Sequence, residues 1–183
     1  MDHSDHVALL RDGVLTGDTA SSDAAWADLG SGGGAFTLAL ADLLGPGATI
    51  ISVDRDTRAL AEQRALVAAR FPQTRLTQIT GDFTRPLGLS SLDGIVMANS
   101  LHFVRDKAPV LALAHGYLRP GGRLILVEYN ADRGNPWVPW PMAFPTWQRI
   151  ATGAGFSMPR LLATRPSRFL REIYSAACER EIT

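Results

Sequence analysis

Residues 24–44 read AAWADLGSGGGAFTLALADLL, and this stretch decides the fold. A short apolar run leads into a turn rich in glycine and then into ten residues that favour a helix, which is the pattern of strand, turn and helix. Glycines in such a turn let the backbone approach a ligand closely and adopt dihedral angles that a Cβ atom would obstruct. Open α/β sheets bind ligands where a strand ends and its helix begins, so the stretch predicts a binding site as well as a fold.

The same alternation continues on both sides of this stretch. The pattern predicts further strands at 48–56, 75–83, 92–104 and 123–130, and helices at 6–15, 57–71, 107–118 and 146–156. Strands separated by helices pair in parallel through right-handed crossovers. Residues 159–169 and 170–178 are strand candidates with only a short link between them, which predicts an antiparallel hairpin. The predicted fold is α/β: a doubly wound, Rossmann-like, mostly parallel seven-stranded sheet with an antiparallel C-terminal hairpin.

Composition narrows the function classes. The chain has 183 residues, 46% of them apolar, which predicts a single domain over residues 1–183. Eighteen Lys and Arg residues balance eighteen Asp and Glu residues, so we expect a small-molecule partner and no nucleic acid. The single Cys178 and the lack of a leader pattern predict a cytoplasmic protein. No apolar run approaches the ~20 residues that span a bilayer, so no membrane association is expected.

The glycine pattern by itself fits two cofactor classes. Gly30, Gly32 and Ala35 also satisfy the G-x-G-x-x-[GA] spacing of dinucleotide sites. Asp28, two residues before the first glycine, separates the two classes. A carboxylate there suits a cationic ligand group such as a sulfonium or an amine, whereas it is poorly placed beside a pyrophosphate.

Five motifs in order strengthen the cationic alternative. They are residues 28–34 (DLGSGGG), 51–54 (ISVD), 81–83 (GDF), 98–102 (ANSLH) and 120–126 (PGGRLIL). Together they resemble the successive motifs of class I S-adenosylmethionine-dependent methyltransferases, over roughly residues 24–130. The hairpin predicted at the end of the chain also agrees with that family's antiparallel final strand.

The resemblance implies a binding role for each matching position, with S-adenosyl-L-methionine as the cofactor. The glycine-rich turn would hold the amino acid portion of the cofactor, and the acid at the end of the second strand would bind the ribose hydroxyls. The acid of the GDF motif would accept a hydrogen bond from the adenine amino group. The cofactor-binding residues expected from the resemblance are Asp28, Gly30, Ser31, Gly32, Gly34, Asp54, Arg55, Asp82, Phe83, Asn99 and Ser100.

The acceptor side is less defined. Methyl transfer is an in-line displacement that depends on alignment, and a weakly acidic acceptor also needs a general base. His102 is the best placed candidate, with Glu128 and Tyr129 as others, although a packing role for His102 is equally compatible with the pattern. Residues 137–147 contain Trp137, Trp140, Phe144 and Trp147, which either line an acceptor pocket or pack against the sheet.

Three functions therefore remain open. The first is methyl transfer to a small or medium-sized molecule; the family's N-P-P-[YF] signature for nucleic acid and protein amines is missing, because Asn99 is followed by Ser100 and Leu101. The second is a cofactor-binding but non-catalytic partner subunit. The third is an NAD(P)-dependent oxidoreductase. A lid over the site could come from residues 1–23, from the aromatic stretch, or from a second subunit in a homodimer.

Overall fold

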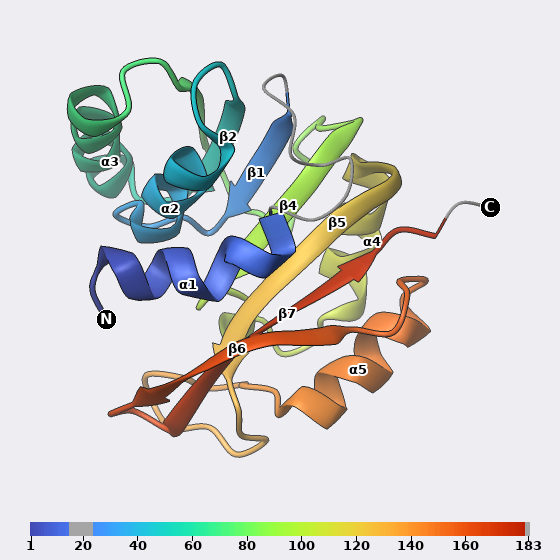
Figure 1. The fold of residues 1–183 in the computed structure, drawn as a ribbon. Helices are drawn as coiled ribbons and strands as arrows, with labels where there is room; N and C mark the ends of the chain where they lie inside the picture. Colours follow the sequence, from blue (N-terminus) through green and yellow to red (C-terminus); the bar gives the residue numbers. More distant parts are fainter. Residues whose placement is uncertain (15–23, 182–183) are drawn as a thin grey trace.

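A computed structural model describes residues 1–14 and 24–181 of the chain. Within these residues the strands form one seven-stranded sheet in the order β3-β2-β1-β4-β5-β7-β6 (Figure 1). Strands β1 to β5 pair in parallel, whereas β7 is antiparallel to both β5 and β6. The strand bounds are β1 Ala25–Leu29, β2 Thr49–Asp54, β3 Arg75–Thr80, β4 Leu92–Ala98, β5 Leu118–Tyr129, β6 Arg160–Ser167 and β7 Arg171–Glu179.

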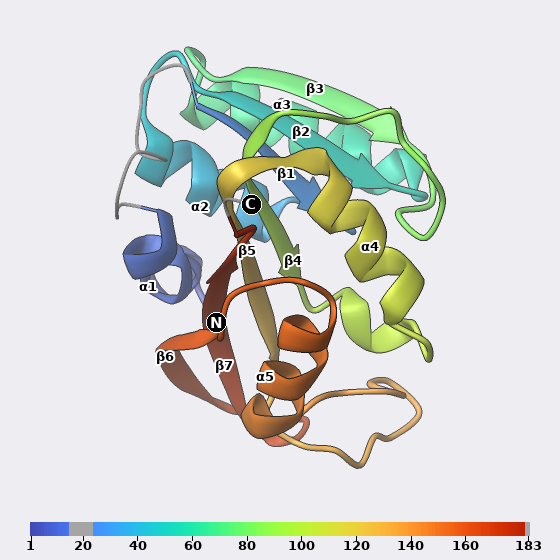
Figure 2. The ribbon, with the colours of Figure 1, turned by 90° about the vertical axis from the view of Figure 1, so that its right-hand side faces the viewer.

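Helices cover both faces of the sheet. Figure 2 shows α1 and α2 on one side of the strands and α4 and α5 on the other. The helix bounds are α1 His3–Val14, α2 Ala35–Leu44, α3 Thr57–Arg70, α4 Ala108–Tyr117 and α5 Phe144–Gly153, with a 3₁₀ turn, η2, at Leu101–Phe103. Asp56 caps α3, because its carboxylate accepts hydrogen bonds from the backbone N–H groups of Arg58 and Ala59. Among the described residues, no helix has both the length and the apolar character that crossing a membrane requires.

The core lies in two layers, one on each face of the sheet. Central strand β1 is buried along most of its length, and Trp26 on it is fully buried. The Trp26 ring packs against Gly94 of neighbouring β4, where a Cβ atom would overlap the ring. Burying each large apolar side chain stabilises the fold by about 1.5–3 kcal/mol. Both layers hold β1 in place, and with it the turn that begins at its carboxyl end.

The predicted fold class is confirmed, including the antiparallel hairpin made by β6 and β7. Several element bounds differ from the predicted ones. The strand predicted over 92–104 ends at Ala98, because Asn99 adopts a left-handed φ of 52° that breaks the strand. The strand predicted from 123 begins at Leu118, where β5 pairs with β4 across a register shift. The first helix begins at His3, and its predicted last residue, Leu15, lies outside the described residues.

Candidate functional site

The glycine-rich turn between β1 and α2 requires glycine at particular positions. Gly30, Gly32 and Gly34 have φ angles of 80°, 50° and 86°, a region that L side chains rarely adopt. A Cβ atom on Gly30 would also lie 2.5 Å from the Cβ atom of Ser100. The backbone N–H groups of Gly30 and Ser31 donate to the carbonyl of Val53 at 2.8 Å and 3.0 Å, which ties the turn to the end of β2.

A chain of buried hydrogen bonds supports this turn from below. Gln63 of α3 accepts from the Ser52 hydroxyl at 2.6 Å and donates to Thr37 of α2 at 2.9 Å; Thr37 in turn donates to Asp28 at 2.6 Å. The Ser31 and Ser52 hydroxyls are 2.8 Å apart, and since the Ser52 proton goes to Gln63, Ser31 is the donor. All donors therefore point the same way, from the turn to the Asp28 carboxylate. We call these five residues the turn network.

Asp28 differs from the expectation that it faces the ligand. Its carboxyl group is 1% exposed and accepts from Thr37 inside the protein. It lines neither of the two cavities that adjoin the turn. Burial raises the pKa of Asp28 to about 7, although the hydrogen bond from Thr37 acts in the opposite direction. Asp28 thus acts on the turn through the network and not by lining a cavity.

The first cavity, the cofactor cleft, has a volume of about 730 Å³ and lies at the carboxyl ends of β1, β2 and β4. Asp54 is on its wall, and its two carboxylate oxygens accept from the backbone N–H groups of Gly32 at 2.7 Å and Asp56 at 2.9 Å. Each carboxylate oxygen has two lone pairs, so Asp54 retains capacity for a ligand hydroxyl. The predicted residues on this wall are Gly30, Gly32, Asp54, Arg55, Asp82, Phe83, Asn99 and Ser100.

Asp82 belongs to the GDF motif at 81–83 and lines the cofactor cleft. One of its oxygens accepts from the backbone N–H and the hydroxyl of Thr84, at 2.9 Å and 2.7 Å. These hydrogen bonds hold the pKa of Asp82 below its usual range. The other oxygen lies 3.7 Å from the Arg55 guanidinium, which is largely exposed. Asp82 is therefore an ionised acceptor at the mouth of the cleft.

Asn99 and Ser100 close the inner end of the cleft. The Ser100 hydroxyl donates to the carbonyl of Leu29 at 2.7 Å, so it is used in joining the ends of β1 and β4. The Oδ1 atom of Asn99 is buried and has no hydrogen-bond partner among the described residues. A buried polar atom without a partner is costly, and a ligand that donates a hydrogen bond would remove that cost.

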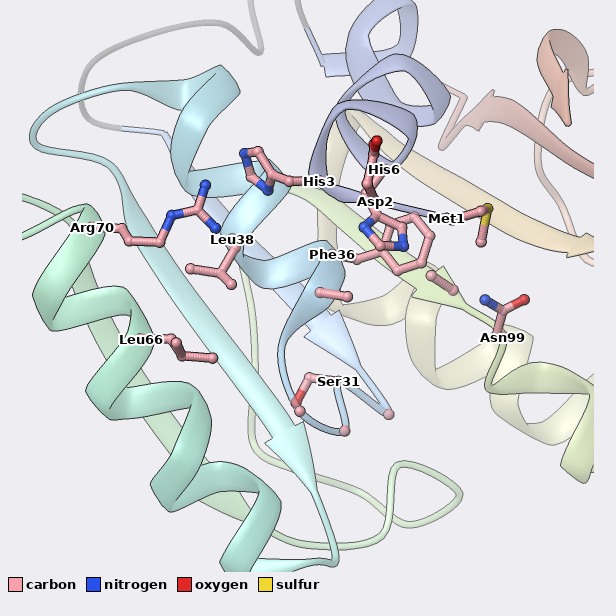
Figure 3. Close-up of a pocket in the computed structure, with 15 residues that line it drawn as sticks. Met1, Asp2, His3, His6, Ser31, Phe36, Leu38, Leu66, Arg70 and Asn99 are labelled. Atoms are coloured by element: carbon pink, nitrogen blue, oxygen red, sulfur yellow. The ribbon is translucent and has the colours of Figure 1, made fainter.

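A second cavity, which we call the α1 cavity, lies on the other side of the turn and has a volume of about 580 Å³. Figure 3 shows the His6 and Phe36 rings above the glycine-rich turn, with Asn99 on one side and Arg70 and Leu66 on the other. Ser31 lines this cavity and not the cleft, whereas Gly30, Gly32 and Asn99 line both. The two cavities therefore meet at the turn.

Of the two roles left open for His102, general base and packing residue, its environment favours packing. His102 is 3% exposed, and its Nδ1 atom donates to the fully buried Glu128 carboxylate, 3.0 Å from Oε1. Burial lowers the pKa of the Lys107 ammonium group, although the negative charge of Glu128 acts in the opposite direction. That ammonium group donates to the carbonyls of Val104 and Trp140 at 2.6 Å and 3.0 Å. We call His102, Lys107 and Glu128 the histidine cluster; none of the three lines the cofactor cleft or the α1 cavity.

The aromatic stretch divides between the two predicted roles. Trp147 on α5 is fully buried, whereas Trp137 and Trp140 are 69% and 44% exposed. Trp140 stacks on the Arg105 guanidinium, 5.1 Å from the ring centroid, and its backbone N–H donates to the carbonyl of His102. None of these tryptophans lines the cofactor cleft or the α1 cavity.

The structure thus brings most predicted residues to the cofactor cleft, with Asp28, Ser31, Gly34 and His102 as the exceptions. Gly34 packs against Gln63, where a Cβ atom would overlap the glutamine side chain. Sequence reasoning missed Thr84, Phe103 and Arg105 on the cleft wall. Phe103 and Arg105 follow the motif after β4 directly, so their position in the chain was a usable signal. A contribution from residues 1–23 was expected only as one of three possible lids, because the pattern of α1 suggests no more than a short helix.

Comparison with known proteins agrees with this geometry. The chain matches the model of a family described as "Methyltransferase domain" over residues 27–124. The YcgJ protein from Bacillus subtilis has a similar fold, with a TM-score of 0.76 at 12% identity, covering 99% of this chain and 100% of that one.

Curated relatives include enzymes that act on sulfur and arsenic. The chain is 32% identical to the human thiol S-methyltransferase TMT1B over 148 residues, which is 76% of this chain and 56% of that protein. It is 27% identical to the arsenite methyltransferase of Aquipseudomonas alcaligenes over 158 residues, 76% of this chain and 46% of that protein. The chain spans about half the length of these curated relatives.

Proposed function

This chain belongs to the methyltransferase domain family, and we propose that it transfers a methyl group from S-adenosylmethionine to a small or medium-sized molecule. The observation that carries the proposal is the cofactor cleft, in which a left-handed glycine turn and the acidic side chains of Asp54 and Asp82 meet at the carboxyl edge of the sheet. The glycine spacing fits both methyltransferases and NAD(P)-dependent oxidoreductases, and it was the main reason for considering an oxidoreductase. Membership of the methyltransferase domain family removes that reason.

The residues of the cleft fit the cofactor. Asp54 would accept hydrogen bonds from the ribose hydroxyls, Asp82 from the adenine amino group with Phe83 beside the ring, and Asn99 Oδ1 from the ammonium group of the methionine portion. Gly30 leaves the space that a Cβ atom would fill. When bound, S-adenosylmethionine supplies a methyl group on a positively charged sulfur. The protein then has to align the acceptor with that group and exclude water.

A small acceptor fits the charge and the size of the site. The formal net charge is zero, which gives no attraction for nucleic acid, and the two cavities have the volumes of small-molecule sites. Of the relatives' acceptors, a thiol suits this chain better than arsenite. Arsenite is a thiol-seeking acceptor, and the single Cys178 is 2% exposed with its pKa raised by burial.

Calorimetric titration with S-adenosylmethionine and S-adenosylhomocysteine, with NAD and NADP as controls, tests the cofactor. Binding of the adenosyl ligands alone is the expected result. Asp54→Ala should weaken that binding by about 1.5–3 kcal/mol, the cost of a lost charge-assisted hydrogen bond. The matched control is Asp56→Ala, which removes a helix cap two residues away and should leave the affinity unchanged. Cofactor binding without methyl transfer to any of a broad panel of acceptors would favour the non-catalytic subunit instead.

A further inference from the structure

The α1 cavity is a separate space that shares a wall with the cofactor cleft. Gly30, Gly32 and Asn99 face both cavities, so the cavities meet at the turn and a molecule in the α1 cavity would be a neighbour of a ligand in the cleft. A volume of about 580 Å³ is within the usual range for small-molecule sites. The cavity is therefore a candidate site for a second substrate.

The lining of the α1 cavity combines apolar surface with polar side chains. Phe36, Leu38 and Ala98 supply buried apolar surface, and Leu66 supplies exposed apolar surface. This composition suits a compact apolar molecule that carries a small polar group. The cationic side chain on the lining, Arg70, belongs to the far end of α3 and stacks on Phe71.

His6 is the polar group best suited to reaction with such a molecule. Its ring contacts Phe36 edge-on, with centroids 4.8 Å apart, and neither ring nitrogen has a hydrogen-bond partner among the described residues. Burial lowers the pKa of His6, so the neutral ring that can accept a proton is favoured at neutral pH. The other titratable groups near it are the N-terminal ammonium of Met1, the adjoining Asp2, and His3 and Asp5 on α1. His3 and Asp5 are engaged with Asp42 and Arg165.

We propose that the α1 cavity binds the methyl acceptor, a compact apolar molecule with a weakly acidic thiol or hydroxyl, and that His6 accepts the acceptor's proton. The inference rests on the proposed function and adds to it the acceptor site and its chemistry. In the balanced step, the acceptor gives its proton to the His6 ring and uses the freed electron pair to bond the methyl carbon. The electron pair of the broken carbon–sulfur bond stays on the cofactor sulfur.

Binding is tested without turnover. Phenylmethanethiol, which has an apolar ring and a weakly acidic thiol, is titrated into protein saturated with S-adenosylhomocysteine and followed by NMR. Benzyl methyl sulfide, which has no S–H proton, is the control ligand. We expect both ligands to shift the signals of Ala98 and Phe36, and the thiol alone to shift the titration midpoint of the His6 ring. Phenol tests the hydroxyl version of the same chemistry.

A matched pair of variants tests the role of His6. His6→Gln should lower the rate of methyl transfer to phenylmethanethiol about 100-fold, the middle of the usual range for a general base, and leave the affinity for S-adenosylhomocysteine unchanged. It should also remove the limb of the pH–rate profile in which the rate rises as His6 loses its proton. The control is His115→Gln on α4, whose ring packs against Phe156 and which lies outside both cavities. This control should keep the wild-type rate and profile.

Each contrary result has a distinct meaning. Ligand-induced shifts confined to the Trp137 and Trp140 indoles would overturn the assignment of the α1 cavity and move the acceptor to the aromatic stretch. No binding of either the thiol or phenol would overturn the proposed acceptor chemistry. An unchanged pH profile in His6→Gln would remove His6 from the reaction. Failure to bind S-adenosylhomocysteine, by contrast, would contradict the proposed function itself and with it this inference.

Discussion

The turn network and the histidine cluster are both buried near the carboxyl edge of the same sheet, and they differ in chemistry. The turn network runs through hydroxyl and amide groups, each donating to the next, and ends on the single carboxylate of Asp28. The histidine cluster instead sets the buried Glu128 carboxylate against His102 and Lys107. Its outer contacts are to backbone carbonyls of Val104 and Trp140.

The difference indicates what each cluster is for. Ser31, a member of the turn network, itself lines the α1 cavity. The histidine cluster reaches neither the cofactor cleft nor the α1 cavity, and it joins η2, α4 and the aromatic stretch to one another. Changes in the turn network should therefore alter ligand affinity, whereas changes in the histidine cluster should act first on stability.

The largest effect is expected for Glu128→Ala. It leaves the buried His102 Nδ1 and the backbone N–H of Tyr129 without their acceptor, and each orphaned buried group costs about 1–3 kcal/mol, or about 2–6 kcal/mol together. Urea denaturation measures this loss, and calorimetry on the folded variant should find an unchanged affinity for S-adenosylhomocysteine. Glu62→Ala, which breaks an exposed ion pair with Arg58, is the control and should cost less than about 0.5 kcal/mol. A large loss of affinity in Glu128→Ala would break the division between the two clusters.

Asp28 should make stability depend on pH. The folded-state pKa of Asp28, about 7, lies above the unfolded value of 3.8. The stabilisation that protonated Asp28 gives the folded state is therefore fully present below about pH 4 and is lost as the pH rises toward 7. A shift of about three units corresponds to about 4 kcal/mol. Asp28→Asn cannot ionise, so the wild type should lose about 4 kcal/mol relative to this variant between pH 4 and pH 8. Parallel stability curves for the two proteins would show that Asp28 does not titrate in this range.

Gly30→Ala should damage the turn itself. A left-handed conformation costs an L residue about 1–2 kcal/mol, and the contact with Ser100 adds the cost of overpacking, for a total of about 2–4 kcal/mol. Thermal unfolding and S-adenosylhomocysteine affinity should both decline. The control is Gly33→Ala, whose new Cβ atom meets no atom within 4 Å, and its stability should stay close to the wild-type value. Equal behaviour of the two variants would show that the turn tolerates side chains throughout.

Ser31→Ala should have the smallest effect, because it removes the first donor of the turn network at a partly exposed position. The expected cost is about 1 kcal/mol, the net value of one hydrogen bond, seen as a several-fold weaker affinity for S-adenosylhomocysteine. Stability should change little. Wild-type affinity would mean that the network supports the fold without reaching the ligand.

Much of the cleft was predictable because local patterns carry it. An apolar strand followed by an acid places Asp54 at a strand end, and a glycine turn after β1 places Gly30 beside it. The orientation of Asp28 was not predictable from the same pattern. The sequence-based prediction paired it with a cationic ligand group, whereas its partner is Thr37, nine residues later on α2. Which side of a strand end faces the ligand depends on the helix packed against that side.

The sequence by itself determined the sheet, the antiparallel hairpin and the cofactor class, because these follow from periodicity and from motifs that are contiguous in the chain. Only the tertiary structure decided that His102 is buried against Glu128, 26 residues away, and that α1 brings His6 to the far side of the turn. Both arrangements depend on contacts between segments that are distant in the sequence. Such contacts are set by how whole helices pack on the sheet, and no local pattern records that packing.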